Sequence, residues 1–130
     1  MKKVFLGGTC NGSKWRDSLI PKLKIDYFQP QTDEWTHEMM EEELKQRKVC
    51  DFCLYVITPK MTGFYSVAEV VDDSNKRPEK TIFSFLNEDD GSTFSEHQQK
   101  SLEQTAKMII GNGAKYLKTF DEIAEYLNNH

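Results

Sequence analysis

Hydrophobic residues form five short runs along the chain, and apolar positions recur at helical spacing in the segments between them. The runs predict strands at residues 3–8, 25–28, 52–57, 81–86 and 114–117. Start signals and helix formers predict helices that begin near residues 13, 36, 66, 95 and 120. Because strands and helices alternate, the expected fold class is α/β: a five-stranded parallel sheet with right-handed crossovers and helices on both faces.

Several details of these elements are specific enough to test. Ser13 is expected to cap the first helix, which Pro21 ends or kinks. The uninterrupted apolar run Phe52–Ile57 is typical of a central strand that is buried on both faces. A polar loop is expected at residues 87–93. The covered side of the helix at residues 36–49 is expected to carry Met39, Met40, Leu44 and Val49.

Length and composition limit the classes of protein that fit. The chain has 130 residues, 38% of them hydrophobic, so residues 1–130 are expected to form a single domain around one core. Its apolar runs are far shorter than the roughly 20 residues of a membrane span. The net charge of −4, without a basic block, offers little attraction to a nucleic-acid polymer. We therefore expect neither a membrane nor a nucleic-acid partner.

Cysteine and histidine usage bears on the compartment and on metals. Cys10, Cys50 and Cys53 are odd in number, and two of them lie in or beside a buried strand, so reduced thiols and a cytoplasmic location are expected. Cys50 and Cys53 match a C-x-x-C redox pattern, but such pairs open a helix, and core packing is the favoured interpretation. No metal site and no cofactor are expected, because no metal-ligand spacing is formed by His37, His97 and His130.

Three loops are candidates for a binding site, because parallel sheets bind ligands outside the carboxyl ends of their strands. They lie at residues 7–13, 58–66 and 87–93. The first offers backbone N–H groups that suit an anion or a hydroxyl-rich ligand, although its glycines are equally consistent with a simple turn. Arg16 follows one helical turn later, where it either reaches a bound anion or pairs at the surface with Asp17 or solvent.

Glu69 lies one turn into a helix at the same edge and has two interpretations. Ser66 and Glu69 fit the S-x-x-E capping box, which would contribute stability alone. Alternatively, Glu69 faces the cleft as a carboxylate nucleophile or acid–base group, as carboxylates do at glycosidic carbons. Candidate partners on the preceding helix are Glu41, Glu42 and Glu43, and periodicity does not distinguish among them.

Several segments together resemble one known family. They are Val4-Phe5-Leu6-Gly7-Gly8, Trp15-Arg16, Pro30, Trp35, the apolar strand after Asp51, and the segment from Gly63 to Glu69. Over residues 3–86 the chain is similar to the nucleoside 2-deoxyribosyltransferase-like proteins. The resemblance implies a flavodoxin-like (Rossmann-like) three-layer sandwich. It also implies cleavage or exchange of the N-glycosidic bond of a nucleoside or nucleotide.

The resemblance implies roles for individual residues. In the family a glutamate at the start of a helix attacks the anomeric carbon, and Glu69 matches that position. An acidic residue on the preceding helix positions the sugar and the nucleophile, and Glu43 matches it best. Relatives that act on nucleotides bind phosphate through the first-strand loop and an arginine, to which Gly8, Asn11 and Arg16 correspond. The expected substrate-binding set also includes Trp15, Pro30, Gly63 and Ser66.

One departure from the family leaves a second function open. Relatives commonly carry a pair of acidic residues just before the glycine of the nucleophile loop, where a carboxyl can protonate the leaving base. This chain has Lys60-Met61-Thr62 there. A nucleotide-binding or sensing module without catalysis is therefore the alternative to an enzyme.

Two expectations concern partners. Relatives complete their pocket with a residue of a neighbouring subunit, so a homo-oligomer is expected, with Met61, Phe64 and Tyr65 able to cover the contact. An interaction or phosphoacceptor module built on Asp51 is disfavoured, because Asp51 precedes its strand and belongs at the edge opposite the cleft. The expected partner is a small-molecule nucleoside or nucleotide.

Overall fold

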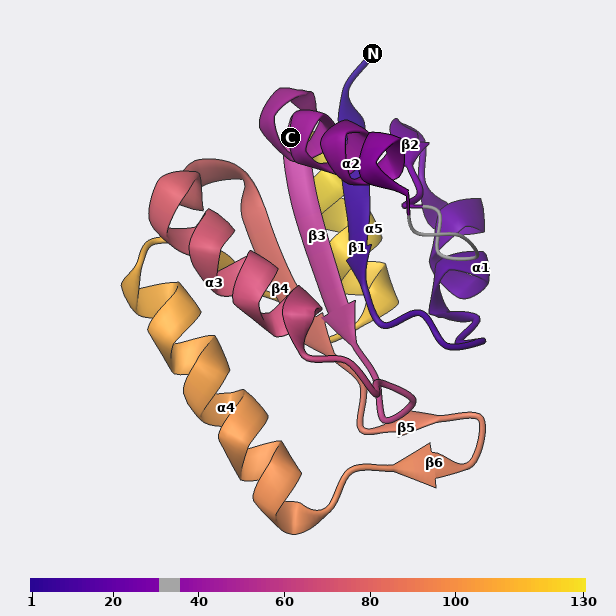
Figure 1. The fold of residues 1–130 in the computed structure, drawn as a ribbon, viewed down its shortest axis with the longest axis vertical. Coiled ribbons are helices and arrows are strands. Elements are labelled where there is room, and N and C mark those ends of the chain that lie inside the picture. Colours follow the sequence, from indigo (N-terminus) through magenta and orange to yellow (C-terminus); the bar gives the residue numbers. More distant parts are fainter. Residues whose placement is uncertain (31–35) are drawn as a thin grey trace.

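The five predicted strands form one parallel sheet in the computed structural model, which describes residues 1–30 and 36–130 (Figure 1). Every neighbouring pair is parallel, and the order across the sheet is β2-β1-β3-β4-β7. This is the doubly wound, flavodoxin-like strand order, so the predicted fold class is confirmed. The strands are β1 (Lys3–Gly8), β2 (Asp26–Phe28), β3 (Phe52–Ile57), β4 (Thr81–Phe85) and β7 (Lys115–Tyr116).

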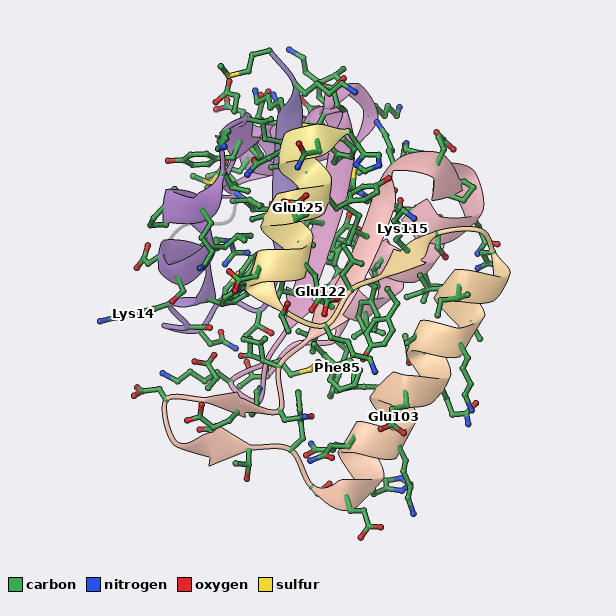
Figure 2. All side chains as sticks on the ribbon, turned by 180° about the vertical axis from the view of Figure 1, so that it is seen from behind. Lys14, Phe85, Glu103, Lys115, Glu122 and Glu125 are labelled. Atoms are coloured by element: carbon green, nitrogen blue, oxygen red, sulfur yellow. The ribbon has the colours of Figure 1, made fainter. Side chains whose placement is uncertain are left out.

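Helices cover both faces of the sheet and complete three layers. On the face nearer the viewer in Figure 1 lie α2 (His37–Val49), α3 (Tyr65–Lys76) and α4 (Glu96–Gly111). The opposite face, which Figure 2 shows with α5 in front, carries α1 (Trp15–Leu19) and α5 (Phe120–Asn129). Two short 3₁₀ helices follow α1 and precede β4: η1 (Ile20–Lys22) and η2 (Pro78–Lys80).

Alternating strand residues supply a hydrophobic core on each side of the sheet, because successive side chains point to opposite faces. The central strand β3 is buried at every position, as its apolar run predicts. The inward faces predicted for α4 and α5 are also confirmed. The core beneath α3 and α4 includes Phe5, Tyr55, Phe83, Val70, Leu102 and Ile109. The core beneath α1 and α5 includes Val4, Leu6, Val56, Trp15, Leu19, Ile123 and Leu127.

The covered side predicted for α2 is wrong. Of the apolar residues expected to be covered, Met39 is half-buried, whereas Met40, Leu44 and Val49 are exposed. The buried residues of this helix are Gln46 and Arg47. Hydrophobic burial therefore contributes little to the placement of α2, which depends instead on the polar side that carries Arg47.

Two local predictions at the carboxyl edge also differ from the structure. Helix α1 has no side-chain cap, and the Ser13 hydroxyl instead donates to Asp89 Oδ2 at 2.5 Å. Residues 87–93, expected as a loop, contain a hairpin of β5 (Glu88–Asp89) and β6 (Ser92–Thr93). Its turn residues Asp90 and Gly91 both have positive φ, the conformation that two-residue hairpin turns require. Helix α1 does end at Leu19, before Pro21, as predicted.

The two edges of the sheet differ in what they carry. The hairpin and the loops after β1 and β3 gather at the carboxyl edge, whereas both chain termini lie at the other edge (Figure 1). Lys2 Nζ donates there to the carbonyl of His130. Asp51 precedes β3 at this second edge and accepts a hydrogen bond from the backbone N–H of Lys3 at 2.9 Å. A ligand site at the carboxyl edge therefore does not include Asp51.

Three remaining observations concern earlier expectations. Trp35 belongs to residues 31–35 and lies outside the described residues. All three cysteines are free, and Cys50 and Cys53 are buried, which agrees with core packing. In the ranges that the structure describes, no helix has the length and apolar character needed to cross a bilayer.

Gly8 gives a stability prediction for this fold. Its φ is +120°, and a Cβ added there would lie 2.1 Å from the carbonyl oxygen of Val56 on the neighbouring strand. We expect Gly8→Ala to lower the free energy of unfolding by about 3 kcal/mol or more, from steric overlap and backbone strain together. Urea denaturation followed by circular dichroism measures the loss. The matched control is Gly63→Ala, since a Cβ at Gly63 meets nothing within 4 Å. Equal midpoints for the two variants would contradict the prediction.

Candidate functional site

A cavity of about 130 Å³ opens at the carboxyl edge of the sheet, beside β1 and the start of α3. Its wall combines the Gly-Gly end of β1, a guanidinium from α1, a carboxylate from α2 and a carboxylate from α3. Four elements that are distant in sequence therefore bring polar groups to one place. The lining residues are Gly7, Gly8, Cys10, Arg16, Pro30, Glu43, Tyr65, Ser66 and Glu69.

Of the nine residues expected to act in catalysis or substrate binding, six meet at this cavity and three do not. The indole of Trp15 is buried in the core and donates to the carbonyl of Thr9 at 2.9 Å. Asn11 is exposed and donates through Nδ2 to Thr62 Oγ1 at 2.7 Å, joining the loops after β1 and β3. Gly63 is exposed and does not line the cavity. The residues that do line it are Gly8, Arg16, Pro30, Glu43, Ser66 and Glu69.

The capping-box interpretation of Ser66 and Glu69 is wrong. Helix α3 begins at Tyr65, with Phe64 at the N-cap position and no side-chain cap. The Ser66 hydroxyl instead donates to the carbonyl of Gly8 at 3.2 Å, which ties the start of α3 to the end of β1. Glu69 makes no capping bond and lies in the cavity wall, 8% exposed.

Burial is the main influence on the ionisation of Glu69. Together with the nearby carboxylates of Glu43, Asp73 and Asp72, it raises the pKa of Glu69 to about 7, against the opposing charge of Arg47. Arg47 Nη1 lies 3.7 Å from Glu69 Oε2. Burial also raises the pKa of Glu43, while Arg47 and Arg16 oppose that rise. The cavity therefore holds two carboxyl groups that change charge above the usual range of glutamate.

Arg47 belongs to a buried ionic network behind Glu69, which the sequence analysis did not identify. The carboxylate of Asp73, 0% exposed, accepts from Arg47 Nε at 3.2 Å, from Arg47 Nη2 at 2.9 Å and from the Tyr55 hydroxyl at 2.5 Å. Arg77 Nη1 also contacts this carboxylate. One signal in the sequence did exist: Arg47 follows Glu43 by four residues, and Asp73 follows Glu69 by four, so each pair shares a helix face.

Arg16 is buried, so the interpretation that it pairs at the surface with Asp17 or solvent is wrong. It is 8% exposed, with its guanidinium 4.5 Å from the centre of the Trp15 ring. Its Nε donates to the carbonyl of Leu6 at 3.1 Å and its Nη1 to the carbonyl of Thr9 at 2.9 Å. Its buried Nη2 has no hydrogen-bond partner within the part of the chain that the structure describes. A buried donor without a partner is costly, so Nη2 is suited to an acceptor of a bound ligand.

The hairpin residue Asp89 is a second feature that the sequence analysis missed. Its Oδ2 accepts from the hydroxyl of Ser13 at 2.5 Å and from the hydroxyl of Thr58 at 2.6 Å. One carboxylate thus joins the loops that follow β1, β3 and β4. Nothing in its polar surroundings of Asn87 to Thr93 distinguishes Asp89 from Asp90, which pairs with Lys60 at 3.1 Å.

The fold and the cavity define a class: a doubly wound α/β domain whose candidate site centres on a buried glutamate at the start of a helix. Residues 1–85 match the model of the family described as nucleoside 2-deoxyribosyltransferase like, and the chain belongs to this family. No individual curated protein matches the chain. Among residues 1–30 and 36–130, no group of three or more His, Cys, Asp or Glu side chains is arranged to hold a metal ion.

The raised pKa of Glu69 gives a prediction for stability against pH. Glu69 keeps its proton to about pH 7 in the folded state, whereas a glutamate in the unfolded chain loses it near pH 4.5. Between these values the folded state binds more protons, so the free energy of unfolding falls as pH rises, by about 3 kcal/mol in all. We expect Glu69→Gln to lack this fall, so its free energy of unfolding should rise relative to that of the parent protein between pH 4.5 and 8.

Urea unfolding at several pH values checks this expectation. The matched control is Glu125→Gln, since Glu125 is an exposed glutamate on α5, on the other side of the sheet. Its stability should follow the parent protein at every pH. A constant difference between Glu69→Gln and the parent across this range would show that Glu69 titrates as an ordinary glutamate.

Proposed function

We propose that the protein cleaves or exchanges the N-glycosidic bond of a nucleoside or nucleotide, with Glu69 as the nucleophile. The observation that carries the proposal is a carboxylate free of any capping role, buried in the wall of a cavity with Glu43, in a chain of this family. A carboxylate in such a place is suited to attack a glycosidic carbon.

The proposed reaction has two steps. The Glu69 carboxylate forms a bond to C1′ of the sugar as the C1′–N bond breaks, and the base leaves with that bonding pair and takes up a proton. A water molecule or a second base then attacks C1′ and releases Glu69, which gives hydrolysis or transfer. The raised pKa of Glu43 supports it as a proton donor to the leaving base, besides its proposed part in orienting the sugar.

Two features support a nucleotide over a nucleoside. The buried Nη2 of Arg16 has no partner in the described part of the chain, and a phosphate oxygen is a strong acceptor for it. The N-terminus of α3, a helix of 12 residues, reaches the same cavity through Tyr65 and Ser66. The dipole of this helix favours an anion there.

The alternative is a module that binds a nucleotide without chemistry, and the loop before α3 favours it. Lys60 pairs with Asp90, and the Thr62 hydroxyl accepts from Asn11. Met61 packs against the core beneath α3 and α4. None of these side chains lines the cavity or offers a carboxyl to a leaving base.

Partners and location form a further part of the proposal. Phe64 and Tyr65 are 78% and 63% exposed where α3 begins, Tyr65 in the wall of the cavity, and a second copy of the chain would cover them. We therefore propose a homo-oligomer. The three free thiols support a cytoplasmic location, and the small-molecule site supports neither a nucleic-acid polymer nor a membrane as partner.

Release of free base tests the proposal. After incubation with a panel of nucleosides and their 5′-phosphates, chromatography should detect free base from at least one of them. Glu69→Ala should reduce the rate by about 10³-fold or more, because no other group replaces the nucleophile. Glu43→Gln should reduce it by about 10²-fold.

The matched control is Glu41→Gln, whose carboxylate is 65% exposed and pairs with His37 away from the cavity. It should retain the parent rate, which separates Glu43 from its neighbours on α2. Tight binding of an unchanged nucleotide, with no base released over prolonged incubation, would reject the enzyme and favour the binding module.

A further inference from the structure

We propose that Arg47 is a positioning residue for Glu69: its guanidinium, fixed from behind by Asp73, favours the anionic form of the Glu69 carboxylate and directs it into the cavity. This inference rests on the proposed function only for the consequence that Glu69 reacts. The contact between Arg47 and Glu69 is part of the structure, and its effect on the titration of Glu69 can be tested without a substrate.

The hydrogen bonds of Arg47 divide its guanidinium into two sides. Nε and Nη2 donate to the two oxygens of Asp73 at 3.2 and 2.9 Å, in the fork geometry that arginine and carboxylate favour. Nη2 also donates to Asp72 Oδ2 at 3.0 Å. The remaining nitrogen, Nη1, lies 3.7 Å from Glu69 Oε2. One side is therefore fixed, and the other presents positive charge to Glu69.

Asp73 is itself held on several sides, which prevents the guanidinium from turning away. Its carboxylate accepts from the Tyr55 hydroxyl on β3 at 2.5 Å and contacts Arg77 at the end of α3. It is 0% exposed, so bulk solvent does not reach its oxygens. A lysine in place of Arg47 would offer one point of attachment and would lose the planar fork.

The distance between Arg47 and Glu69 suits a nucleophile better than a closer contact would. At 3.7 Å the pair attracts electrostatically but does not form a hydrogen bond. The lone pairs of Glu69 therefore stay available for the sugar carbon. Arg47 is 5% exposed and does not line the cavity, so it acts through Glu69 and does not touch a ligand.

The other charges around Glu69 explain why Arg47 matters for its ionisation. Glu43 on α2 and Asp72 and Asp73 on α3 all disfavour the Glu69 anion, as does burial. The Tyr55 hydroxyl on β3 stays neutral, because burial and Asp73 raise its pKa. Arg47 opposes all of these. Burial lowers the pKa of Arg47, but its hydrogen bonds with Asp73 and the charges of Asp73 and Glu69 together raise it, so Arg47 stays charged at every pH of interest. Among the described residues that line the cavity, the cation is Arg16, which lies on α1.

A carboxyl-¹³C NMR titration of Glu69, assigned by the signal that disappears in Glu69→Gln, tests the proposal directly. Arg47→Met removes the charge and keeps an unbranched chain, and the midpoint should rise by about 1 pH unit or more. Arg47→Lys should give a smaller rise in the same direction. Arg77→Met is the matched control, because it removes the other guanidinium on Asp73 without a contact to Glu69, and its midpoint should match the parent protein.

The variants also separate positioning from stability. Arg47→Met and Arg77→Met should both unfold at lower urea concentration. Of these two, only Arg47→Met should raise the titration midpoint of Glu69, and the fall of kcat/KM at acid pH should shift to higher pH with it. An unchanged midpoint in the Arg47 variants, or an equal rise in Arg77→Met, would overturn the proposal. If Arg47→Met does not fold, Arg47→Lys decides in the same way. A shifted midpoint in a protein that releases no base would support the positioning of Glu69 and reject the proposed function.

Discussion

A fully buried carboxylate, Asp73, is the constraint on which the candidate site depends. It joins β3 through Tyr55, α2 through Arg47 and the end of α3 through Arg77. A buried charge without such partners would be strongly destabilising, so the loss of any one of these contacts lowers the stability of the whole junction. Helix α2 buries Gln46 and Arg47 in place of apolar side chains, and its position on the sheet therefore relies on this ionic junction where other helices rely on hydrophobic cores.

The placement of α2 in turn determines the chemistry of the cavity. Glu43 lies one helical turn before Arg47 and faces the same side of α2, which brings it to Glu69 on α3. Two carboxyl groups then lie in a poorly hydrated space beside Arg47, where burial raises the pKa of both acids, the charge of Glu43 adds to the rise at Glu69, and Arg47 opposes both shifts. The site thus combines two carboxyl groups, Glu43 and Glu69, whose neutral forms are favoured by burial, with a fixed cation, Arg47, that favours the charged form of Glu69.

The fold could be predicted because hydrophobic patterning encodes it. The polar contacts between distant segments could not be predicted, because no local pattern encodes them. The apolar run of β3 and the inward residues of α4 and α5 follow periodicity, and the structure agrees with them. Ser13 and Ser66 carry local capping signals, yet both hydroxyls bond groups far along the chain, Asp89 and Gly8. Periodicity failed for α2 because an ionic junction, and not an apolar stripe, selects its buried side. Glu69 was a candidate from its place at the carboxyl edge, and the resemblance added the expected role of nucleophile. The four-residue spacing from Glu43 was the sequence signal for Arg47, and Asp89 had none.

The part of the chain that matches the family and the part beyond it contribute different features to the structure. Residues 1–85 contain every residue that lines the cavity, and the match ends with β4. The remainder adds the hairpin, α4, β7 and α5, of which the last three extend the sheet or cover its faces. The hairpin differs, because Asp89 ties Ser13 and Thr58 together from outside the matched region. A change in that hairpin would therefore act on the loop that follows Gly8 and leave Glu69 on α3 in place.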